Sequence, residues 1–246
     1  MAKQRGINTH VFINGYDFSN YFKSFKGGAS VDALDATAFQ DTAKAYLVSA
    51  FQMGKMDLEG FYASDQATAD QIDDILRPKL GNETKNVVTV APISANTLGN
   101  YCFMASADLL NLNVDDIADG LVMETANFQS SSGLESGVIL QVKTSLTATG
   151  NGSSVDNTAA TTNGGAGHLH VFSKSGTSPT LDVKIQHSTD NSTWVDLITF
   201  TQATDITSER ITVAAGTTVR RYLRAIRTIG GTSTPTFSVA VSFARH

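Results

Sequence analysis

The hydrophobic pattern of the first part of the chain is that of short β-strands, because apolar and polar residues alternate with a period of two. Residues 10–14, HVFIN, followed by Gly15, predict a strand and a tight turn. In residues 55–61, KMDLEGF, a strand would carry Asp57 and Glu59 on one solvated face. Further strands are predicted over residues 21–25, 86–92, 100–114 and 121–129, with a turn over residues 115–120.

The segment that follows the second predicted strand is apolar but irregular. Residues 29–39 begin as a strand, and the alternation fails near Asp35. Residues 40–55 then lack a strand period, so we expect an irregular connection that another surface covers. Its apolar residues are Tyr46, Leu47, Val48, Phe51 and Met53.

One segment has the period of an α-helix. Residues 64–80 are SDQATADQIDDILRPKL, in which Ser64 is a suitable N-cap and Arg77 followed by Pro78 marks the end. The sequence therefore predicts one helix over residues 64–76. Its buried face would consist of Ala69, Ile72, Ile75 and Leu76.

A small, polar stretch, QSSSGLESG over residues 129–137, has the composition of a domain linker, and we place the boundary between Leu134 and Glu135. The alternating runs after it have the spacing of a β-sandwich. The low-complexity segment 149–167 is expected to be a mobile surface loop. The predicted strands lie in residues 138–149, 168–174, 181–188, 193–201, 208–214, 219–228 and 235–243.

Length and composition agree with two β-rich domains. The chain has 246 residues, and its polarity comes from Ser, Thr, Asn and Gly more than from the 17% of charged residues. Such a composition favours strands and turns. The first ten residues contain no apolar signal segment, and no run reaches the roughly 18 apolar residues of a membrane span. We therefore expect no membrane anchor.

Charge is distributed unequally between the two parts. Residues 1–136 hold 9 Lys and Arg against 17 Asp and Glu, whereas residues 137–246 hold 9 against 6. An acidic first part argues against phosphate binding there, because nucleic-acid affinity depends on clustered Lys and Arg. It is compatible with DNA that passes nearby without adsorbing.

Catalytic patterns are missing from the sequence. There is no Gly-x-Ser-x-Gly elbow, Walker loop or His-Glu-x-x-His, and the single cysteine, Cys102, cannot form a zinc cluster or an internal disulfide. Asp57 and Glu59 have the residue types of an acid–base pair, but a solvated face or a pore wall is the preferred interpretation. We expect no catalytic residue, no metal site and no cofactor, and we expect Cys102 to be buried.

Two further groups have a chemical and a structural interpretation. His168 and His170 lie on one face of a predicted strand and with His187 are a potential metal site, but histidines on a solvated face are the preferred interpretation. Trp194 is interpreted as a core residue in preference to a sugar platform.

A basic cluster lies near the C-terminus. In a strand, Arg220 and Arg224 would lie on one face and Arg221 and Arg227 on the other. This division disfavours a phosphate patch and predicts paired surface arginines.

Residues 31–62 resemble the major tail proteins of bacteriophages, which form the tail tube. In that family a strand ends in Asp-x-Thr-x-Phe, an irregular loop carries a Tyr and apolar neighbours, and a strand ending in Gly-Phe/Tyr precedes a single helix. The order of elements matches over about residues 7–130, although Gln40 and Ser49-Ala50 replace small Gly-rich turns. The matching residues are Asp35, Thr37 and Phe39, then Tyr46, Leu47 and Phe51, and then Gly60, Phe61 and Tyr62.

The resemblance implies a structural virion protein that is not an enzyme. The fold would be mainly β, with a tail-tube β-sandwich or barrel and one flanking α-helix over residues 1–134, followed by an immunoglobulin-like β-sandwich over residues 135–246. Six copies would form a ring whose channel is lined by two long hairpins of each copy, with Asp57 and Glu59 facing the lumen. Contacts between subunits and stacked rings would use Asp35, Thr37, Phe39, Tyr46, Leu47 and Phe51.

The implied partners are other copies of the chain, the tape measure, tail terminator and baseplate or tail-tip proteins, and double-stranded DNA that crosses the lumen without specific binding. The location would be the virion tail, after assembly in the host cytoplasm. The C-terminal part is similar to immunoglobulin-like or carbohydrate-binding-like appendages of phage tail and capsid proteins. It would lie outside the tube, contact host glycans weakly and favour a non-contractile tail, because a sheath would crowd it.

Two other functions are kept as alternatives. One is a carbohydrate-binding or adhesion module on a virion or a secreted scaffold. The other is a hydrolase with an appended sandwich, which would need a pocket with perturbed carboxylates.

Overall fold

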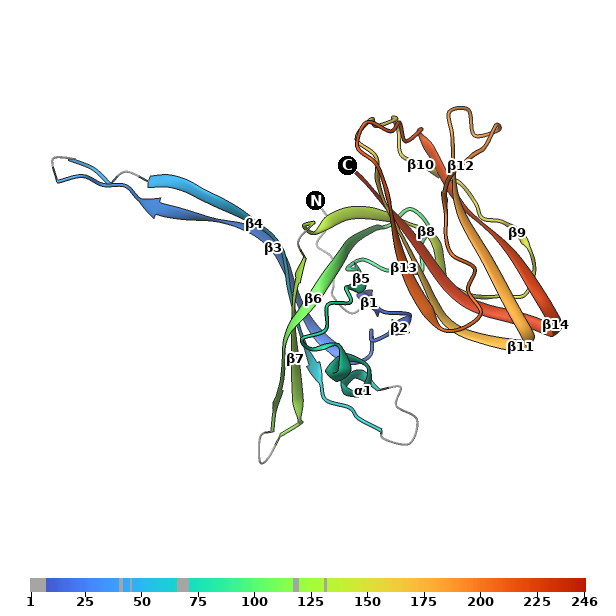
Figure 1. Ribbon diagram of the computed structural model, residues 1–246, viewed down its shortest axis with the longest axis horizontal. Coiled ribbons are helices and arrows are strands. Elements are labelled where there is room, and N and C mark those ends of the chain that lie inside the picture. The colour runs from blue at the N-terminus through green and yellow to red at the C-terminus, as the bar shows by residue number, and fades with distance from the viewer. Residues whose placement is uncertain (1–7, 40–41, 45, 66–70, 117–119, 131) are drawn as a thin grey trace. The chain divides into compact units, whose positions relative to one another are not determined.

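The computed structural model describes residues 8–39, 42–44, 46–65, 71–116, 120–130 and 132–246 (Figure 1). Strands dominate the described chain, which confirms the prediction of a mainly β protein. No helix in these ranges is long and apolar enough to cross a membrane.

The contacts divide the chain into two compact units. The first unit consists of Met1–Asn20, Asn86–Met104 and Glu135–His246, and the second unit of Tyr21–Lys85 and Ala105–Leu134. The predicted boundary between Leu134 and Glu135 is one of the points at which the chain passes from one unit to the other. The division into folding domains at residues 1–134 and 135–246 stays a prediction.

The second unit is built on a four-stranded antiparallel sheet in the order β3-β4-β7-β6. The strands are β3 (Phe22–Asp35), β4 (Tyr46–Phe61), β7 (Met123–Ser130) and β6 (Tyr101–Asp115), of which residues 105–115 belong to this unit. β3 and β4 run side by side as a long hairpin (Figure 1). β6 and β7 form a second hairpin, as predicted, and the middle of its turn, residues 117–119, lies outside the described residues.

The irregular connection predicted for residues 40–55 is wrong for most of its length. β4 begins at Tyr46, which is paired with Asp35, and Val31 is paired with Phe51 further along the hairpin. A strand with apolar residues on both faces also reads as an apolar run without alternation. Periodicity alone therefore does not distinguish such a strand from a loop that another surface covers.

The predicted helix exists but is much shorter than expected. α1 spans Ile72–Leu76 and continues as a 3-10 turn, η2, over Arg77–Lys79. The residue before the helix is Gln71, which makes no capping hydrogen bond, so the prediction of Ser64 as the N-cap is wrong. The Ser64 hydroxyl instead donates to the Asp74 carboxylate at 2.7 Å. Ile72 and Leu76 are buried as predicted, and Ala69 lies outside the described residues.

The first unit is organised by two very long strands, β11 (Gly165–Ser188) and β14 (Tyr222–Arg245). They pair antiparallel from Gly165 opposite Arg245 to Ser188 opposite Tyr222. The register shifts between residues 171 and 180, where Gly176 and, on the partner strand, Gly231 have φ angles of 99° and 114°. A left-handed backbone favours glycine, so the paired strands bend at this point. Each of the two strands therefore joins two of the short strands predicted from the sequence.

Both halves of the bent strand pair face one core. Leu169 and Val171 precede the bend in β11, Val183 and Ile185 follow it, and all four are buried in the same cluster. β13 (Thr207–Val213) pairs with the half of β11 before the bend, and β12 (Val195–Thr199) pairs with the half after it. The strands therefore form two layers around this core, and the immunoglobulin-like description stays a prediction.

A second apolar cluster lies on the other side of the layer that contains β8 (Glu135–Leu146). It includes Phe12 of β1 (His10–Ile13), Ala91 of β5 (Asn86–Ala91) and Cys102 at the start of β6. β2 (Tyr16–Asp17) continues this sheet beside β1. Cys102 is buried, as predicted, and burial raises the pKa of its thiol to about 12.

The loop predicted over residues 149–167 is wrong in part. It contains β9 (Gly150–Asn151) and β10 (Val155–Asp156), both paired with β14, and it ends inside β11. A Cβ atom at Gly165 would lie 2.2 Å from the Ala244 carbonyl oxygen, so a glycine is required there by the close approach of two backbones. Low apolar content does not prevent a strand from forming where the main chain pairs with a well-anchored neighbour.

Candidate assembly surface

The sheet of the second unit has β3 as one outer strand. At the other end of the sheet, β6 also pairs with β5, but β5 has six residues against the fifteen of β6, so part of that edge extends beyond β5. Among the described residues of the chain, β3 pairs only with β4. An outer strand presents unpaired backbone N–H and C=O groups, which makes it a template for a strand of another molecule.

The end of the β3–β4 hairpin carries three of the residues singled out from the sequence. The Asp35 carboxylate accepts hydrogen bonds from the backbone N–H of Thr37, at 3.0 Å, and from its hydroxyl. These bonds lower the pKa of Asp35. Phe39 is fully exposed, so the hairpin leaves a large apolar side chain in water that a packed neighbour would cover. The side chains of Tyr46, Leu47 and Phe51 lie outside what the structure describes.

One face of the sheet is polar, and Asp57 and Glu59 lie on it as predicted. The ammonium group of Lys23 lies 2.8 Å from the Glu59 carboxylate, and that of Lys55 lies 3.5 Å from the Asp57 carboxylate. Asn127 also donates to Asp57 at 2.6 Å. The two acids therefore sit in a charge-balanced surface. Lys23 and the Asn127 amide escaped the sequence analysis because cross-strand neighbours are distant in the chain.

The opposite face of the sheet holds an acid that the sequence analysis missed. Glu124, in β7, has no exposed surface, and α1 brings Asp73 and Arg77 next to it. Burial, followed by the nearby Asp73 carboxylate, raises the pKa of Glu124 to about 8. The Arg77 guanidinium is paired with Asp73, so two carboxyl groups share one cation. The sequence analysis placed this position in a strand over residues 121–129, but no sequence signal identified the partner of Glu124.

The β6–β7 hairpin adds exposed apolar side chains to the second unit. Leu110 is 63% exposed at a register shift in β6, and Leu121 is 66% exposed beyond the end of that strand. Val114 is 40% exposed on the same strand. Together with the outer strand β3, the part of β6 beyond its pairing with β5, and Phe39, these side chains define the candidate assembly surface.

His168 and His170 are buried in the first unit, so their predicted solvated face is wrong. The Gly15 N–H donates to His170 Nδ1 at 3.4 Å, which places the proton of that ring on Nε2. Nε2 then donates to the Thr89 hydroxyl at 3.0 Å, and the same hydroxyl is hydrogen-bonded to His168 Nδ1 at 3.1 Å. Burial lowers the pKa of His170 to about 3 and that of His168 well below its usual value. The alternating pattern could not show that Phe12 of β1 and Thr89 of β5 cover this face.

No metal site joins these histidines in the described part of the chain, which has no cluster of three or more His, Cys, Asp or Glu side chains placed to bind an ion. His187 is buried separately and accepts a hydrogen bond from the Arg220 backbone at 3.3 Å. The three histidines are therefore structural in this geometry.

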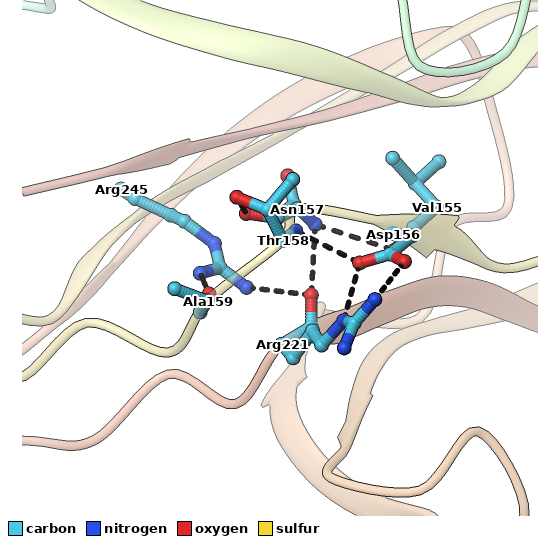
Figure 2. A network of polar contacts seen from close by, with 7 residues as sticks. All are labelled: Val155, Asp156, Asn157, Thr158, Ala159, Arg221 and Arg245. Atoms are coloured by element: carbon cyan, nitrogen blue, oxygen red, sulfur yellow. Dashed lines mark hydrogen bonds and ion pairs between the residues drawn. The ribbon is translucent and has the colours of Figure 1, made fainter.

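Of the clustered C-terminal arginines, Arg221 is ion-paired, as predicted. Figure 2 shows Arg221 forming two hydrogen bonds with the Asp156 carboxylate, at 2.7 and 2.6 Å, which lower the pKa of Asp156 to about 2. Arg245 donates to the backbone carbonyl of Ala159 at 2.6 Å and to that of Arg221 at 3.1 Å. These bonds attach residues 155–159 to the start of β14 and leave no phosphate patch in the network.

The interpretation of Trp194 as a core residue is wrong. Its side chain is half-buried, and the Arg224 guanidinium lies over the indole ring at 4.2 Å from the centroid. The sequence gave no sign that this residue ends a surface turn beside a long strand.

Comparison with known proteins finds neither a family model nor a curated protein that matches the chain. Among solved structures, the Dit protein of phage SPP1, from the hub of an adsorption apparatus, is 12% identical with a TM-score of 0.40, over 96% of this chain and 98% of that one. A chain of the gene transfer agent virion is 9% identical with a TM-score of 0.37, over 54% of this chain and 97% of that one. The anti-feeding prophage tube-terminating cap is 12% identical with a TM-score of 0.37, over 53% and 88%. TM-scores below 0.5 at these identities carry no argument about fold or function.

Proposed function

We propose that the chain is a structural protein of a phage tail, and that its second unit assembles into the stacked rings of the tail tube. The observation that carries the proposal is the outer strand β3 at one end of the four-stranded sheet, together with the exposed apolar side chains on β6 at the other end. The resemblance of residues 31–62 to major tail proteins supports the same conclusion. We infer no enzymatic activity.

In this proposal, β3 of one copy pairs with the part of β6 beyond β5 in the next copy, until the sheet closes into a single barrel. Closure removes the outer strands and so removes the aggregation hazard that they create. Six copies per ring follow from the family resemblance. Leu110 and Val114 on β6 would be covered by the neighbouring copy.

The polar face of the sheet would line the lumen. Asp57 and Glu59 are each paired with a lysine, and the Asn127 amide also donates to Asp57. Such a lining offers DNA no cluster of free cations, and affinity for phosphates depends on such clusters. Double-stranded DNA would therefore pass through without specific binding.

The end of the β3–β4 hairpin would contact the next ring of the stack. Phe39 would insert into an apolar site on that ring, next to the Asp35–Thr37 turn. Tyr46, Leu47 and Phe51 remain proposed contacts of the same interface.

The C-terminal part, residues 135–246, would be an accessory part exposed outside the tube, with weak contact to host glycans. Its position favours a non-contractile tail. The other proposed partners are the tape measure, tail terminator and baseplate or tail-tip proteins, in a virion assembled in the host cytoplasm.

Negative-stain electron microscopy of the full chain at several concentrations tests the proposal. The wild-type protein should form rings or hollow tubes. The Leu110→Glu, Val114→Glu double variant should stay monomeric, because pairing would bury two unpaired carboxylates. Ile206→Glu, a similarly exposed site in the first unit, is the matched control and should assemble normally.

A second variant separates ring closure from stacking. Phe39→Asp should leave the rings intact and shorten or abolish the tubes. A wild-type protein that remains monomeric at high concentration would overturn the proposal of a tube subunit.

A further inference from the structure

The face of the first unit that carries Trp194 is built from three adjacent strands. Gln186 of β11 is paired with Arg224 of β14 on one side and with Asp196 of β12 on the other. Residues that oppose one another across a sheet point to the same face, so these three side chains form a row. Trp194 lies at the end of this row, under Arg224.

Hydrogen bonds fix every polar member of the row. Arg224 donates to the Gln186 amide oxygen from Nε at 3.0 Å and from Nη2 at 2.7 Å. The Gln186 amide nitrogen donates to the Asp196 carboxylate at 2.7 Å, and Lys184 donates to its other oxygen at 2.6 Å. The hydrogen bond from Gln186, followed by that from Lys184, lowers the pKa of Asp196. Each side chain is held by its neighbour before any ligand arrives.

The turn that presents Trp194 is also rigid. The Asp190 carboxylate accepts hydrogen bonds from the Ser192 and Thr193 backbone N–H groups at 2.9 and 2.7 Å. It also accepts from the hydroxyls of Ser188, at 2.8 Å, and Thr193, at 3.1 Å. These bonds hold the pKa of Asp190 well below its usual range. A surface turn with so many internal bonds keeps the indole in one position.

We infer that this row, defined by Trp194, Arg224, Gln186, Asp196 and Lys184, is a binding platform for a neutral saccharide. The Arg224 guanidinium covers the indole at 4.2 Å from the ring centroid, and its own planar, weakly hydrated face is a flat surface for the C–H face of a sugar ring. The carboxylate, amide and ammonium groups beside it offer acceptors and donors to adjacent hydroxyls. Side chains that are already held by hydrogen bonds lose little conformational entropy when a ligand binds.

The charge of the row selects against other ligands. Two cations, Lys184 and Arg224, lie beside one anion, Asp196, to which Lys184 is already bonded. Phosphate-rich ligands need clustered, unpaired cations. A neutral, hydroxyl-rich ligand makes use of both donors and acceptors and needs no net charge.

The inference names a site for the glycan contact proposed for the C-terminal part, and it does not depend on tube assembly. Tubes from a protein that binds no saccharide would overturn only this inference. Saccharide binding by a protein that never forms rings would overturn only the tube proposal.

Trp194 is the single tryptophan of the chain, so its fluorescence reports on this site alone. The full-length protein is titrated with glucose, galactose, N-acetylglucosamine, maltoheptaose and chitotetraose. At least one of these neutral sugars should shift or quench the emission in a saturable way, and calorimetry should give the same affinity.

Variants locate the site. Gln186→Ala should weaken saccharide affinity by about tenfold, because it removes the residue that orients both Arg224 and Asp196. Arg224→Lys keeps the charge and should weaken binding similarly, because it loses the planar stack on the indole. Lys174→Gln, a cation of the first unit outside the row, is the matched control and should bind as the wild type does.

The inference is overturned if none of the five sugars changes the emission at concentrations up to about 50 mM, at which a site with a Kd of about 1 mM is almost fully occupied. It is also overturned if a heparin fragment binds the row in preference to the neutral sugars, or if Gln186→Ala and Arg224→Lys, folded by circular dichroism, bind as tightly as the wild type.

Discussion

The two units of this protein use long antiparallel strand pairs in opposite ways. In the first unit, β11 and β14 bend at Gly176 and Gly231, and both halves bury their apolar side chains in one core. In the second unit, the β3–β4 and β6–β7 hairpins form one sheet and leave Phe39, Leu110 and Leu121 in water. A strand pair that bends over itself buries its own apolar side chains. A strand pair that does not bend in this way leaves apolar side chains exposed, and another molecule can cover them.

The units also differ in the buried ionisable groups that they contain. The first unit buries neutral histidines, and the second buries Glu124 beside a second acid. Burial disfavours the charged form of either group, so the first unit should lose stability in acid and the second in alkali.

The largest effect is expected from damage to the closed core of the first unit. Phe237 is completely buried there, and Phe237→Ala should lower the free energy of unfolding by about 3–5 kcal/mol, because it leaves a cavity. Urea unfolding followed by Trp194 fluorescence measures this loss. Ile206→Ala, at an exposed site, should change stability by less than about 0.5 kcal/mol. A similar loss for both variants would contradict a self-contained core.

The next effect is the acid sensitivity of the first unit. The folded-state pKa values of His168 and His170 lie below the ordinary value of 6.5, so their contribution is fully present above pH 6.5 and is lost as the pH falls below it. Between pH 7 and pH 5 the loss should be roughly 2 kcal/mol for each histidine.

A His168→Gln, His170→Gln double variant tests this origin. It should be less stable than the wild type at pH 7, because the bonds through Thr89 are disturbed, and its stability should change less between pH 7 and pH 5. Urea unfolding of both proteins at the two pH values provides the measurement. Equal pH dependence would show that other groups cause the acid sensitivity.

A smaller effect of opposite sign is expected in the second unit. The folded-state pKa of Glu124, about 8, lies above its ordinary value of 4.5. Its contribution to stability is therefore fully present below pH 4.5 and is lost as the pH rises through 8. Glu124→Gln should remove this loss and gain roughly 1–2 kcal/mol relative to the wild type at pH 9. Unfolding followed by circular dichroism at pH 5 and pH 9 measures it, with the exposed Glu83→Gln as the control.

The smallest effect concerns the exposed network of Figure 2. Asp156 has a folded-state pKa of about 2, below its ordinary value of 3.8, so its contribution is present above pH 3.8 and is lost as the pH falls through 2. Asp156→Asn should leave global stability almost unchanged, since exposed ion pairs contribute little. Amide hydrogen exchange should nevertheless quicken over residues 155–159. Unchanged exchange would show that the strand pairing of β10 alone holds this segment.

Sequence patterns predicted the strands best where alternation was regular. β1, β5, β6 and β7 lie close to their predicted ranges, and the alternation of Asp57 and Glu59 with buried neighbours is observed. The helix was found, but its predicted length was too great. Ser64 has the residue type of an N-cap, but its hydroxyl binds the Asp74 side chain further along the sequence, and a local capping pattern does not show this contact. The candidate assembly surface was predicted only in part, since its outer strands depend on which strands pair.

The sequence by itself determined the mainly β class, the face shared by Asp57 and Glu59, the burial of Cys102 and the pairing of Arg221, because each depends on residue type and short-range period. Only the tertiary structure decided that the two histidines are buried, that Trp194 is on the surface and that Glu124 lies beside Asp73. Alternation shows that a strand has two faces, but what covers each face depends on segments distant in the chain.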